Sequence, residues 1–228
     1  MTDISIIIPF YNEAGNVTSV LEEILDCQPE AEIIAVDDGS TDSTWEEISS
    51  LRGVTGIRFP SNRGQSAAML CGLHRASSNI CVTMDGDGQN DPADIEDLVS
   101  GMSRADAVFG YRRVRKDSWS RRIASRIANR IRRSVVHDGI RDTGCSLKVF
   151  RKEMTACLPP FNGVHRFMGA FFVARGYKIL EVPVNHRPRT QGKSKYNNLN
   201  RGLRGIYDLI GVGWYINRRV NIEVESYE

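Results

Sequence analysis

Residues 80–93 read ICVTMDGDGQNDPA and predict where a strand ends and a helix begins. The first half of the stretch is apolar and rich in β-branched side chains, which is typical of a buried strand. Asp85 and Asp87 follow it one residue apart, each with a glycine after it. We expect the next helix to start after Asp91 with Pro92 at its first position, because proline lacks the N–H that the first helical turn leaves unpaired. The stretch therefore predicts a strand, an acidic loop and a helix.

The same alternation of strand and helix recurs along the chain. Apolar runs predict strands at 4–8, 32–36, 56–59, 79–84 and 106–110. Apolar residues at helical spacing lie between them. Single helices between consecutive strands imply right-handed crossovers, and hence an α/β fold with a doubly wound, mostly parallel sheet flanked by helices. We expect one domain over residues 1–200 and a C-terminal amphipathic extension over residues 201–228.

The composition is that of a globular protein with one unusual segment. A chain of 228 residues with 41% hydrophobic residues can bury a sheet of this kind. Its 30 basic and 28 acidic residues nearly cancel, but residues 112–133 carry ten Lys and Arg against Asp117 alone. This positive segment indicates a polyanion or an acidic surface as a partner. Five cysteines without metal-ligand spacing, and no evident signal peptide or membrane span, predict a cytoplasmic protein.

Every expected strand ends in polar, glycine-rich sequence. The five ends read PFYNEAGN (9–16), DDGSTD (37–42), PSNRGQS (60–66), DGDGQNDP (85–92) and GYRRVR (110–115). In doubly wound sheets, ligands bind outside the carboxyl ends of the strands. The sequence therefore predicts that one edge of the sheet holds the site.

The acids after residue 84 have three interpretations. An EF-hand calcium loop would match at four positions, namely Asp85, Asp87, Gln89 and Glu96, but Asn90 stands where the turn needs glycine and a strand precedes the loop. A tight turn with the acids as helix caps is the structural alternative. Two crowded carboxylates repel unless a cation neutralises them, so Mg²⁺ or Mn²⁺ held together with substrate phosphates fits best. Neither a GxxxxGK[ST] nor a GxGxxG motif is present, which disfavours P-loop and dinucleotide enzymes.

Four segments in this order resemble a known family. They read IIIPFYNE (6–13), AVDDGSTDST (35–44), MDGDGQNDP (84–92) and HRPRTQGKSKY (186–196). The chain is similar to the inverting family 2 glycosyltransferases of GT-A fold, in the branch of dolichyl- and polyprenyl-phosphate sugar synthases. The resemblance implies a metal-dependent transfer of a sugar from a nucleotide-diphosphate sugar to a polyprenyl phosphate, with a β-linked product and Mg²⁺ or Mn²⁺ as the cofactor.

The resemblance also implies roles for particular residues. The residues expected to bind the nucleotide sugar are Pro9, Tyr11, Glu13, Asp37, Asp38, Asp85, Gln89 and Arg189. The expected metal ligands are Asp85, Asp87 and Gln89. The residues expected to act in catalysis are Asp85, Asp87, Arg112, Arg187 and Lys195, the last two in a segment suited to close over the phosphates. The role of Asp142 stays open.

The acceptor side is expected in the basic segment. By resemblance, the lipid phosphate would be held by Arg112, Arg121, Arg122 and Ser125. The segment also predicts an amphipathic helix, with a basic stripe of Arg122, Arg126, Arg130 and Arg133 beside an apolar stripe of Ile123, Ile127, Ile131 and Val135. From the residues alone, the first alternative is a solvated surface helix and the second is a helix that binds nucleic acid. Few aromatic residues accompany the arginines, which disfavours nucleic acid as a partner.

The C-terminal segment predicts contact with a membrane surface. Many relatives continue into transmembrane helices, whereas Leu203, Ile206, Ile210 and Trp214 predict an interfacial helix that cannot span. We therefore expect a peripheral protein on the cytoplasmic face of the membrane, with a small integral membrane protein as a further candidate partner. Three other functions stay open: a different acceptor within the family, a nucleotidyltransferase, and a basic α/β module that binds a nucleotide or nucleic acid without turnover.

Overall fold

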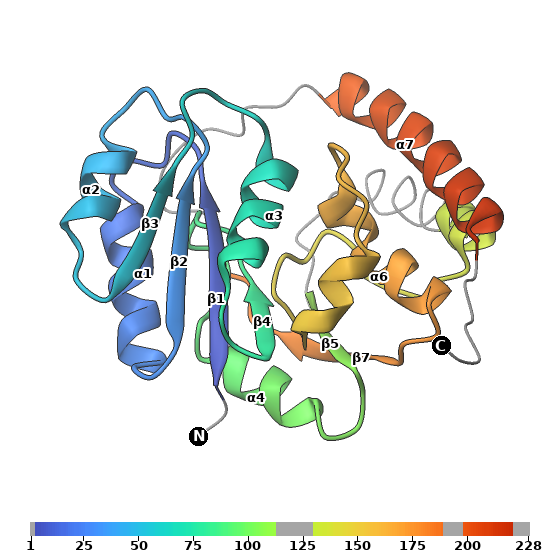
Figure 1. Ribbon diagram of the computed structural model, residues 1–228, viewed down its shortest axis with the longest axis horizontal. Coiled ribbons are helices and arrows are strands. Elements are labelled where there is room, and N and C mark those ends of the chain that lie inside the picture. Colours follow the sequence, from blue (N-terminus) through green and yellow to red (C-terminus); the bar gives the residue numbers. More distant parts are fainter. Residues whose placement is uncertain (1–2, 113–129, 189–197, 221–228) are drawn as a thin grey trace, which may run out of the picture.

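The computed structural model describes residues 3–112, 130–188 and 198–220, which form a sheet with helices on both faces (Figure 1). The sheet has seven strands in the order β3-β2-β1-β4-β6-β5-β7. The strands are β1 (Ile4–Phe10), β2 (Glu32–Asp37), β3 (Val54–Arg58), β4 (Ile80–Thr83), β5 (Ala107–Arg112), β6 (Lys148–Arg151) and β7 (Ile179–Val184). The α/β class and the mostly parallel sheet predicted from the sequence are confirmed.

The five predicted strands all point the same way. β1 pairs in parallel with β2 and β4, and β2 with β3. β6 is antiparallel to both β4 and β5, so β5 runs in the direction of β4. Their carboxyl ends therefore share one edge of the sheet, as the sequence predicts. β6 and β7 were not predicted from the sequence. β6 is antiparallel and lies between β4 and β5, an arrangement that the order of strands along the chain does not reveal.

The helices cover two separate cores. The helical elements are α1 (Val17–Cys27), α2 (Thr44–Ser50), α3 (Gln65–Arg75), α4 (Asp94–Gly101), the short 3-10 helix η1 (Lys152–Cys157), α6 (Val164–Ala174) and α7 (Asn198–Arg218). Alternate residues of β1 point to opposite faces, so Ile7 packs with the core under α3 and α6 while Ile6 and Ile8 pack with the core under α1 and α4. The sheet is thus buried on both faces, which explains its continuous apolar runs.

The start of α4 differs from the sequence prediction. The helix begins at Asp94, two residues later than expected. The Asp91 carboxylate accepts a hydrogen bond from the Ala93 N–H at 3.1 Å, and the Asp91 and Pro92 carbonyls accept from residues 94 and 95. Residues 91–95 therefore form a hydrogen-bonded turn that leads into the helix, so Asp91 does cap this end of the segment, but the α-helical pattern starts only after the turn.

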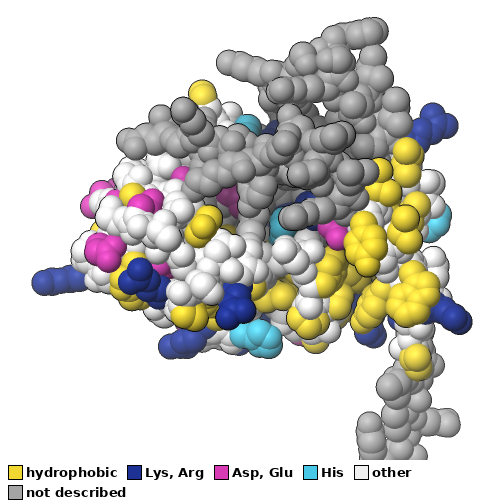
Figure 2. Space-filling model, turned by 90° about the horizontal axis from the view of Figure 1, so that it is seen from above, with side chains coloured by type: hydrophobic (Ala, Val, Ile, Leu, Met, Phe, Trp, Pro, Cys, Tyr) yellow, Lys and Arg dark blue, Asp and Glu magenta, His cyan; other side chains and the backbone are white. Residues whose placement is uncertain are grey.

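The C-terminal helix α7 is half packed and half exposed. Val212 is buried in the core that α7 shares with α6. On the other side Ile206, Ile210 and Trp214 are 59%, 66% and 64% exposed. Figure 2 shows hydrophobic side chains gathered on the side of the molecule where α7 lies. The expected division between residues 200 and 201 falls inside this helix and stays a prediction. None of the helices in the described ranges is long and apolar enough to cross a bilayer.

The two faces of α7 predict different responses to truncation. Val212→Ala removes two buried methyl groups and should lower the free energy of unfolding by about 1–2 kcal/mol. Ile210→Ala, on the exposed side of the same helix, should change it by less than about 0.5 kcal/mol. Urea denaturation of both variants measures the difference. Equal destabilisation would show that α7 does not pack on the body through Val212.

Candidate active site

The acidic loop after β4 is held by close packing against β1. A Cβ at Gly86 would lie 2.3 Å from the Phe10 ring, so no side chain fits between Asp85 and Asp87. Gly88 has φ +72°, a conformation that side chains rarely adopt. The two glycines thus allow the chain to turn sharply at the end of the strand and place both carboxylates at the carboxyl edge of the sheet.

Asp85 sits among hydrogen-bond donors but remains electrostatically unfavourable. Gln65 Nε2 donates to its carboxylate at 2.7 Å, and its own N–H donates to Ser146 Oγ at 3.2 Å. Burial, and then the negative charge of Asp87, raise the pKa of Asp85 to about 6. The crowding of carboxylates that the sequence predicted is therefore present, and a cation between them would relieve it.

Gln89 faces the segment that follows β7. Its side-chain amide donates to the Arg187 carbonyl at 3.3 Å and lies 3.4 Å from His186 Nε2. The Arg187 N–H donates back to the Gln89 carbonyl at 2.8 Å. The Gln89 N–H in turn donates to Asp87 at 3.2 Å. The structure therefore places His186 beside the acidic loop. In the sequence His186 is the first residue of the segment 186–196, and no role was predicted for it.

Arg187 is paired with acids in the structure. Its guanidinium contacts both oxygens of Glu23 at 2.7 and 2.9 Å and Asp91 at 2.9 Å. These pairs join α1, the acidic loop and the end of β7. A role of Arg187 on the donor phosphates would require it to exchange these carboxylates for phosphate, and that role stays a prediction.

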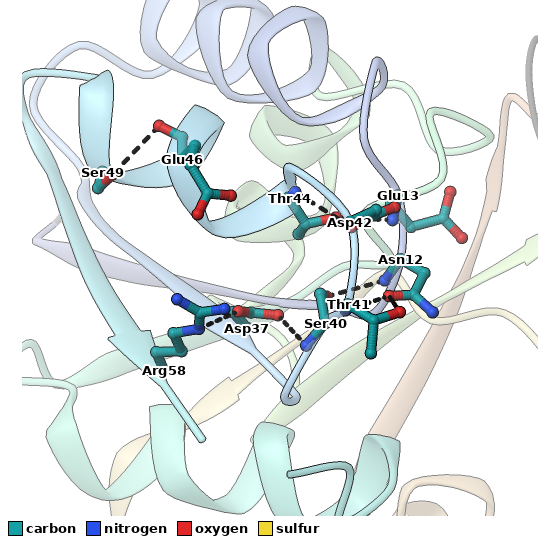
Figure 3. A network of polar contacts seen from close by, with 10 residues as sticks. All are labelled: Asn12, Glu13, Asp37, Ser40, Thr41, Asp42, Thr44, Glu46, Ser49 and Arg58. Carbon is teal, nitrogen blue, oxygen red and sulfur yellow. Dashed lines mark hydrogen bonds and ion pairs between the residues drawn. The ribbon is translucent and has the colours of Figure 1, made fainter. Parts of the chain in front are cut away.

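The two acids after β2 shape loops. Asp37 is fully buried, accepts a hydrogen bond from the Ser40 N–H at 2.9 Å, and lies 3.2 Å from Arg58 Nε (Figure 3). Asp38 accepts from the N–H groups of Arg63 at 2.6 Å and of residue 64 at 2.8 Å. Both acids therefore have a structural role in holding loops, and binding of a nucleotide by these two residues stays a prediction.

The loop after β1 is bonded to the loop after β2. The Asn12 N–H donates to Ser40 Oγ at 2.9 Å, and the Glu13 N–H donates to Thr44 Oγ1 at 2.9 Å (Figure 3). Pro9 and Tyr11 belong to the same segment and are partly exposed. The structure thus brings Pro9, Tyr11 and Glu13 to the edge that also carries Asp37 and Asp38, where they were expected.

A cavity of about 160 Å³ opens beside Asp85. It is lined by Pro9, Gln65, Met69, Thr83, Met84, Asp85, residues 143–146, Lys148, His165, Arg166 and Met168. Lys148 is only 5% exposed and donates to the Cys145 carbonyl, and burial lowers its pKa. Lys148, His165 and Arg166 were not predicted from the sequence, because no local pattern marks a residue that lines the cavity from β6 or α6.

Asp142, whose role the sequence left open, is the partner of Arg112. The Arg112 guanidinium donates to the two Asp142 oxygens at 2.7 and 2.8 Å. This bidentate pair fixes the end of β5 to the loop before β6. The predicted catalytic and acceptor roles of Arg112 stay predictions. Other predicted site residues lie outside the described ranges, namely Arg121, Arg122, Ser125, Arg189 and Lys195.

Only the end of the predicted basic helix is described. Residues 130–136 are helical, as expected, and Arg130 is exposed. Arg132 is buried and binds Asp138, and Arg133 donates to the Ile140 carbonyl at 3.2 and 3.1 Å. Arg133, which was predicted to lie on the basic stripe, therefore also fixes the segment up to Ile140 by hydrogen bonds. Of the apolar stripe, Ile131 is 53% exposed, whereas Val135 is partly buried against the core.

The sequence pattern described as glycosyl transferase family 2 matches residues 5–158. The chain belongs to this family. The resemblance carried by the four motifs is confirmed, and the protein is a glycosyltransferase of this family.

Two relatives align with nearly the whole chain. The dodecaprenyl-phosphate galacturonate synthase of Rhizobium johnstonii is 34% identical over 228 aligned positions, which cover 94% of this chain and 67% of the relative. The undecaprenyl-phosphate 4-deoxy-4-formamido-L-arabinose transferase of Edwardsiella ictaluri is 31% identical over 217 positions, which cover 91% and 66%. The chain thus spans about two thirds of the length of these relatives.

Solved structures share the architecture. Glucosyl-3-phosphoglycerate synthase from Mycobacterium tuberculosis, in complex with Mn²⁺, UDP and glucosyl-3-phosphoglycerate, has a TM-score of 0.74 at 20% identity over 94% of this chain and 80% of that one. The same enzyme with Mg²⁺ and UDP has a TM-score of 0.73 at 20% identity over 94% and 79%. The likeness shows a common fold, and it confirms the GT-A architecture.

The packing of Gly86 on Phe10 makes a testable prediction. Gly86→Ala should lower the free energy of unfolding by about 1–3 kcal/mol, because the added methyl group overlaps the buried ring. Gly211→Ala on α7 is the control. A Cβ at this position would have no neighbouring atom within 4 Å apart from its own helix backbone, and alanine stabilises a helix relative to glycine by up to about 1 kcal/mol. Thermal and urea unfolding measure both. An unchanged stability of the Gly86 variant would contradict the packing described for the acidic loop.

Proposed function

We propose that this glycosyltransferase moves a sugar from a nucleotide-diphosphate sugar to the phosphate of a polyprenyl phosphate, in a reaction that depends on Mg²⁺ or Mn²⁺. The observation that carries the proposal is the crowded pair Asp85 and Asp87 beside a cavity with cationic side chains in its wall. The names of two relatives supply the acceptor class, since both act on a polyprenyl phosphate.

The residues at the edge of the sheet fit a hard divalent ion. Carboxylate oxygens are the ligands such ions prefer, and Mg²⁺ is usually completed by substrate phosphates. In residues 3–112, 130–188 and 198–220 no three His, Cys, Asp or Glu side chains come together as a metal site. Asp85, Asp87 and Gln89 are the proposed ligands, and the ion would stabilise the charge that grows on the diphosphate leaving group.

The proposed roles divide along the sheet edge. Pro9, Tyr11, Glu13, Asp37 and Asp38 lie on the side of β1 and β2, where we place the nucleotide. The cavity beside Asp85, which Pro9 and residues of α6 line together, is where we place the sugar and the acceptor phosphate. Beyond the described residues, the proposed phosphate contacts are Arg121, Arg122, Ser125, Arg189 and Lys195.

The reaction needs no general base from this chain. The acceptor phosphate is already an anion near neutral pH, so one of its oxygens can attack the anomeric carbon directly as the bond to the diphosphate breaks. A single displacement inverts the anomeric centre, so an α-linked donor gives a β-linked sugar phosphate. The contribution of the protein is to position the two anions and to balance their charge with fixed cations.

The proposal predicts strict dependence on the acidic loop. Asp87→Ala should lower turnover by at least about 100-fold, the scale of losing a preorganised charge-stabilising group. Asp97→Ala, an exposed acid on α4, is the matched control and should leave turnover unchanged. The assay follows transfer from a panel of nucleotide sugars to undecaprenyl phosphate with Mn²⁺ or Mg²⁺. Full activity in EDTA, or a product that retains the anomeric configuration, would refute the proposed mechanism.

The exposed face of α7 supports a peripheral position on the membrane. A polyprenyl phosphate presents its phosphate among lipid headgroups, so the enzyme must stay near them to react. Ile206, Tyr207, Ile210 and Trp214 form an exposed apolar face on one helix, as a helix lying in the interface does. We propose that this face docks on the cytoplasmic leaflet and that the exposed Arg130 and its basic segment add attraction to anionic lipids.

The docking face predicts a salt-resistant association with lipid. The Ile210→Ser, Trp214→Ser double variant should bind anionic liposomes at least about tenfold more weakly, because each apolar side chain buried in lipid contributes about 1.5–3 kcal/mol. Asn217→Ser, a polar exchange on the same helix, should bind as the wild type does. Co-sedimentation at low and high salt measures this. Equal pelleting of all three proteins would show that α7 is not the docking face.

A further inference from the structure

The first turn of α6 presents an arginine to the cavity beside Asp85. Arg166 and His165 line this cavity together with Asp85. Ser66 Oγ and His165 Nδ1 lie 2.7 Å apart, and the neighbouring Gln65 donates to Asp85 at 2.7 Å. These two hydrogen bonds tie the start of α6 to the start of α3 and to the acidic loop. The position of Arg166 at the cavity is therefore well defined.

Arg166 differs from Arg112 and Lys148 because one of its buried N–H donors has no acceptor among the described residues. Arg112 is held by both oxygens of Asp142, and Lys148 is buried on the Cys145 carbonyl. Arg166 donates from Nη2 to Asp208 Oδ2 of α7 at 2.5 Å. Its Nε is buried and has no hydrogen-bond partner among the described residues, while 35% of the side chain is exposed. A buried donor without an acceptor is costly, and a bound acceptor would remove that cost.

We propose that Arg166 is a substrate-binding residue that holds an anionic oxygen group in the cavity, with Asp208 as the counter-ion that this group displaces. Guanidinium binds phosphate and carboxylate through two parallel N–H donors, and Arg166 has Nε and a terminal nitrogen to offer. The group is either the phosphate of the lipid acceptor or a carboxylate on the transferred sugar. This choice of ligands rests on the proposed function, but the geometry of Arg166 does not.

The surroundings of Arg166 favour an anion over a neutral group. Arg166 lies in the first turn of an eleven-residue helix, whose N-terminus carries a partial positive charge. His165 and Lys148 line the same cavity. Asp208 brings the compensating charge from α7, the helix that also carries the exposed apolar face. A ligand anion that takes over Arg166 would therefore also release a contact between α6 and the proposed docking helix.

The test compares anionic and neutral ligands of the same shape at equilibrium. Binding of undecaprenyl phosphate and of undecaprenol is measured in identical detergent micelles, and binding of UDP-glucuronate and of UDP-glucose in Mn²⁺. The proteins are the wild type, Arg166→Gln, Asp208→Asn and, as the matched control on the far end of the same helix, the exposed Arg175→Gln. Unfolding temperatures of all four show whether each variant is folded. No turnover is needed, so absence of sugar transfer would refute the proposed function and leave this test intact.

We expect Arg166→Gln to weaken one anionic ligand by about tenfold or more, as for a lost hydrogen bond to a charged group, and to leave its neutral counterpart unchanged. Weakening of undecaprenyl phosphate assigns the acceptor phosphate, and weakening of UDP-glucuronate assigns a sugar carboxylate. Asp208→Asn should tighten the same ligand, and Arg175→Gln should change nothing. Equal effects on anionic and neutral ligands, or no effect of Arg166→Gln on either anion, would overturn the proposal. Weaker anion binding in Asp208→Asn would overturn the role of Asp208 as a displaced counter-ion.

Discussion

Two carboxylates lie one residue apart at the end of β4, and the fold holds them there against their mutual repulsion. The ring of Phe10 leaves no room for a side chain at residue 86, so only glycine fits between Asp85 and Asp87. Burial and the charge of Asp87 together raise the pKa of Asp85. Such a pair of carboxylates becomes favourable when a cation binds to it together with an anionic substrate, which is what the proposed sugar transfer requires.

The rest of the edge is arranged around this pair. Gln65 from α3 and Ser146 from the loop before β6 form hydrogen bonds with Asp85. Gln89 forms a hydrogen bond with the segment after β7. Each of these residues comes from a different connection between strands, and the carboxyl ends of the parallel strands and the start of antiparallel β6 meet at this edge of the sheet. The buried cores on both faces of the sheet keep that edge rigid, because Ile6, Ile7 and Ile8 are each fully buried by helices. Rigid support of this kind is what positions reacting groups.

The C-terminal half supplies part of the cavity wall and an exposed apolar surface. α6 supplies His165 and Arg166 to the cavity, and α7 both covers α6 and exposes an apolar face. An ion pair between Arg166, which lines the cavity, and Asp208 joins these two helices. The surface expected to meet lipid and the cavity expected to meet substrate are therefore neighbours in the structure, which suits an acceptor whose reactive group is attached to a membrane lipid.

Local patterns in the sequence were sufficient for the strands β1 to β5, for their common polar edge and for the acidic loop, because each depends on residues within one strand or one turn. The family was equally evident, since its four motifs are contiguous segments. The tertiary structure alone decided the insertion of β6 between β4 and β5, the pairing of Arg112 with Asp142, and the approach of His186 to Gln89. It also decided that Ser66 meets His165 across 99 residues and that Arg166 meets Asp208 across 42. Contacts between residues so far apart in the chain leave no periodicity or spacing to read, because only the packing of the two cores brings them within hydrogen-bonding distance.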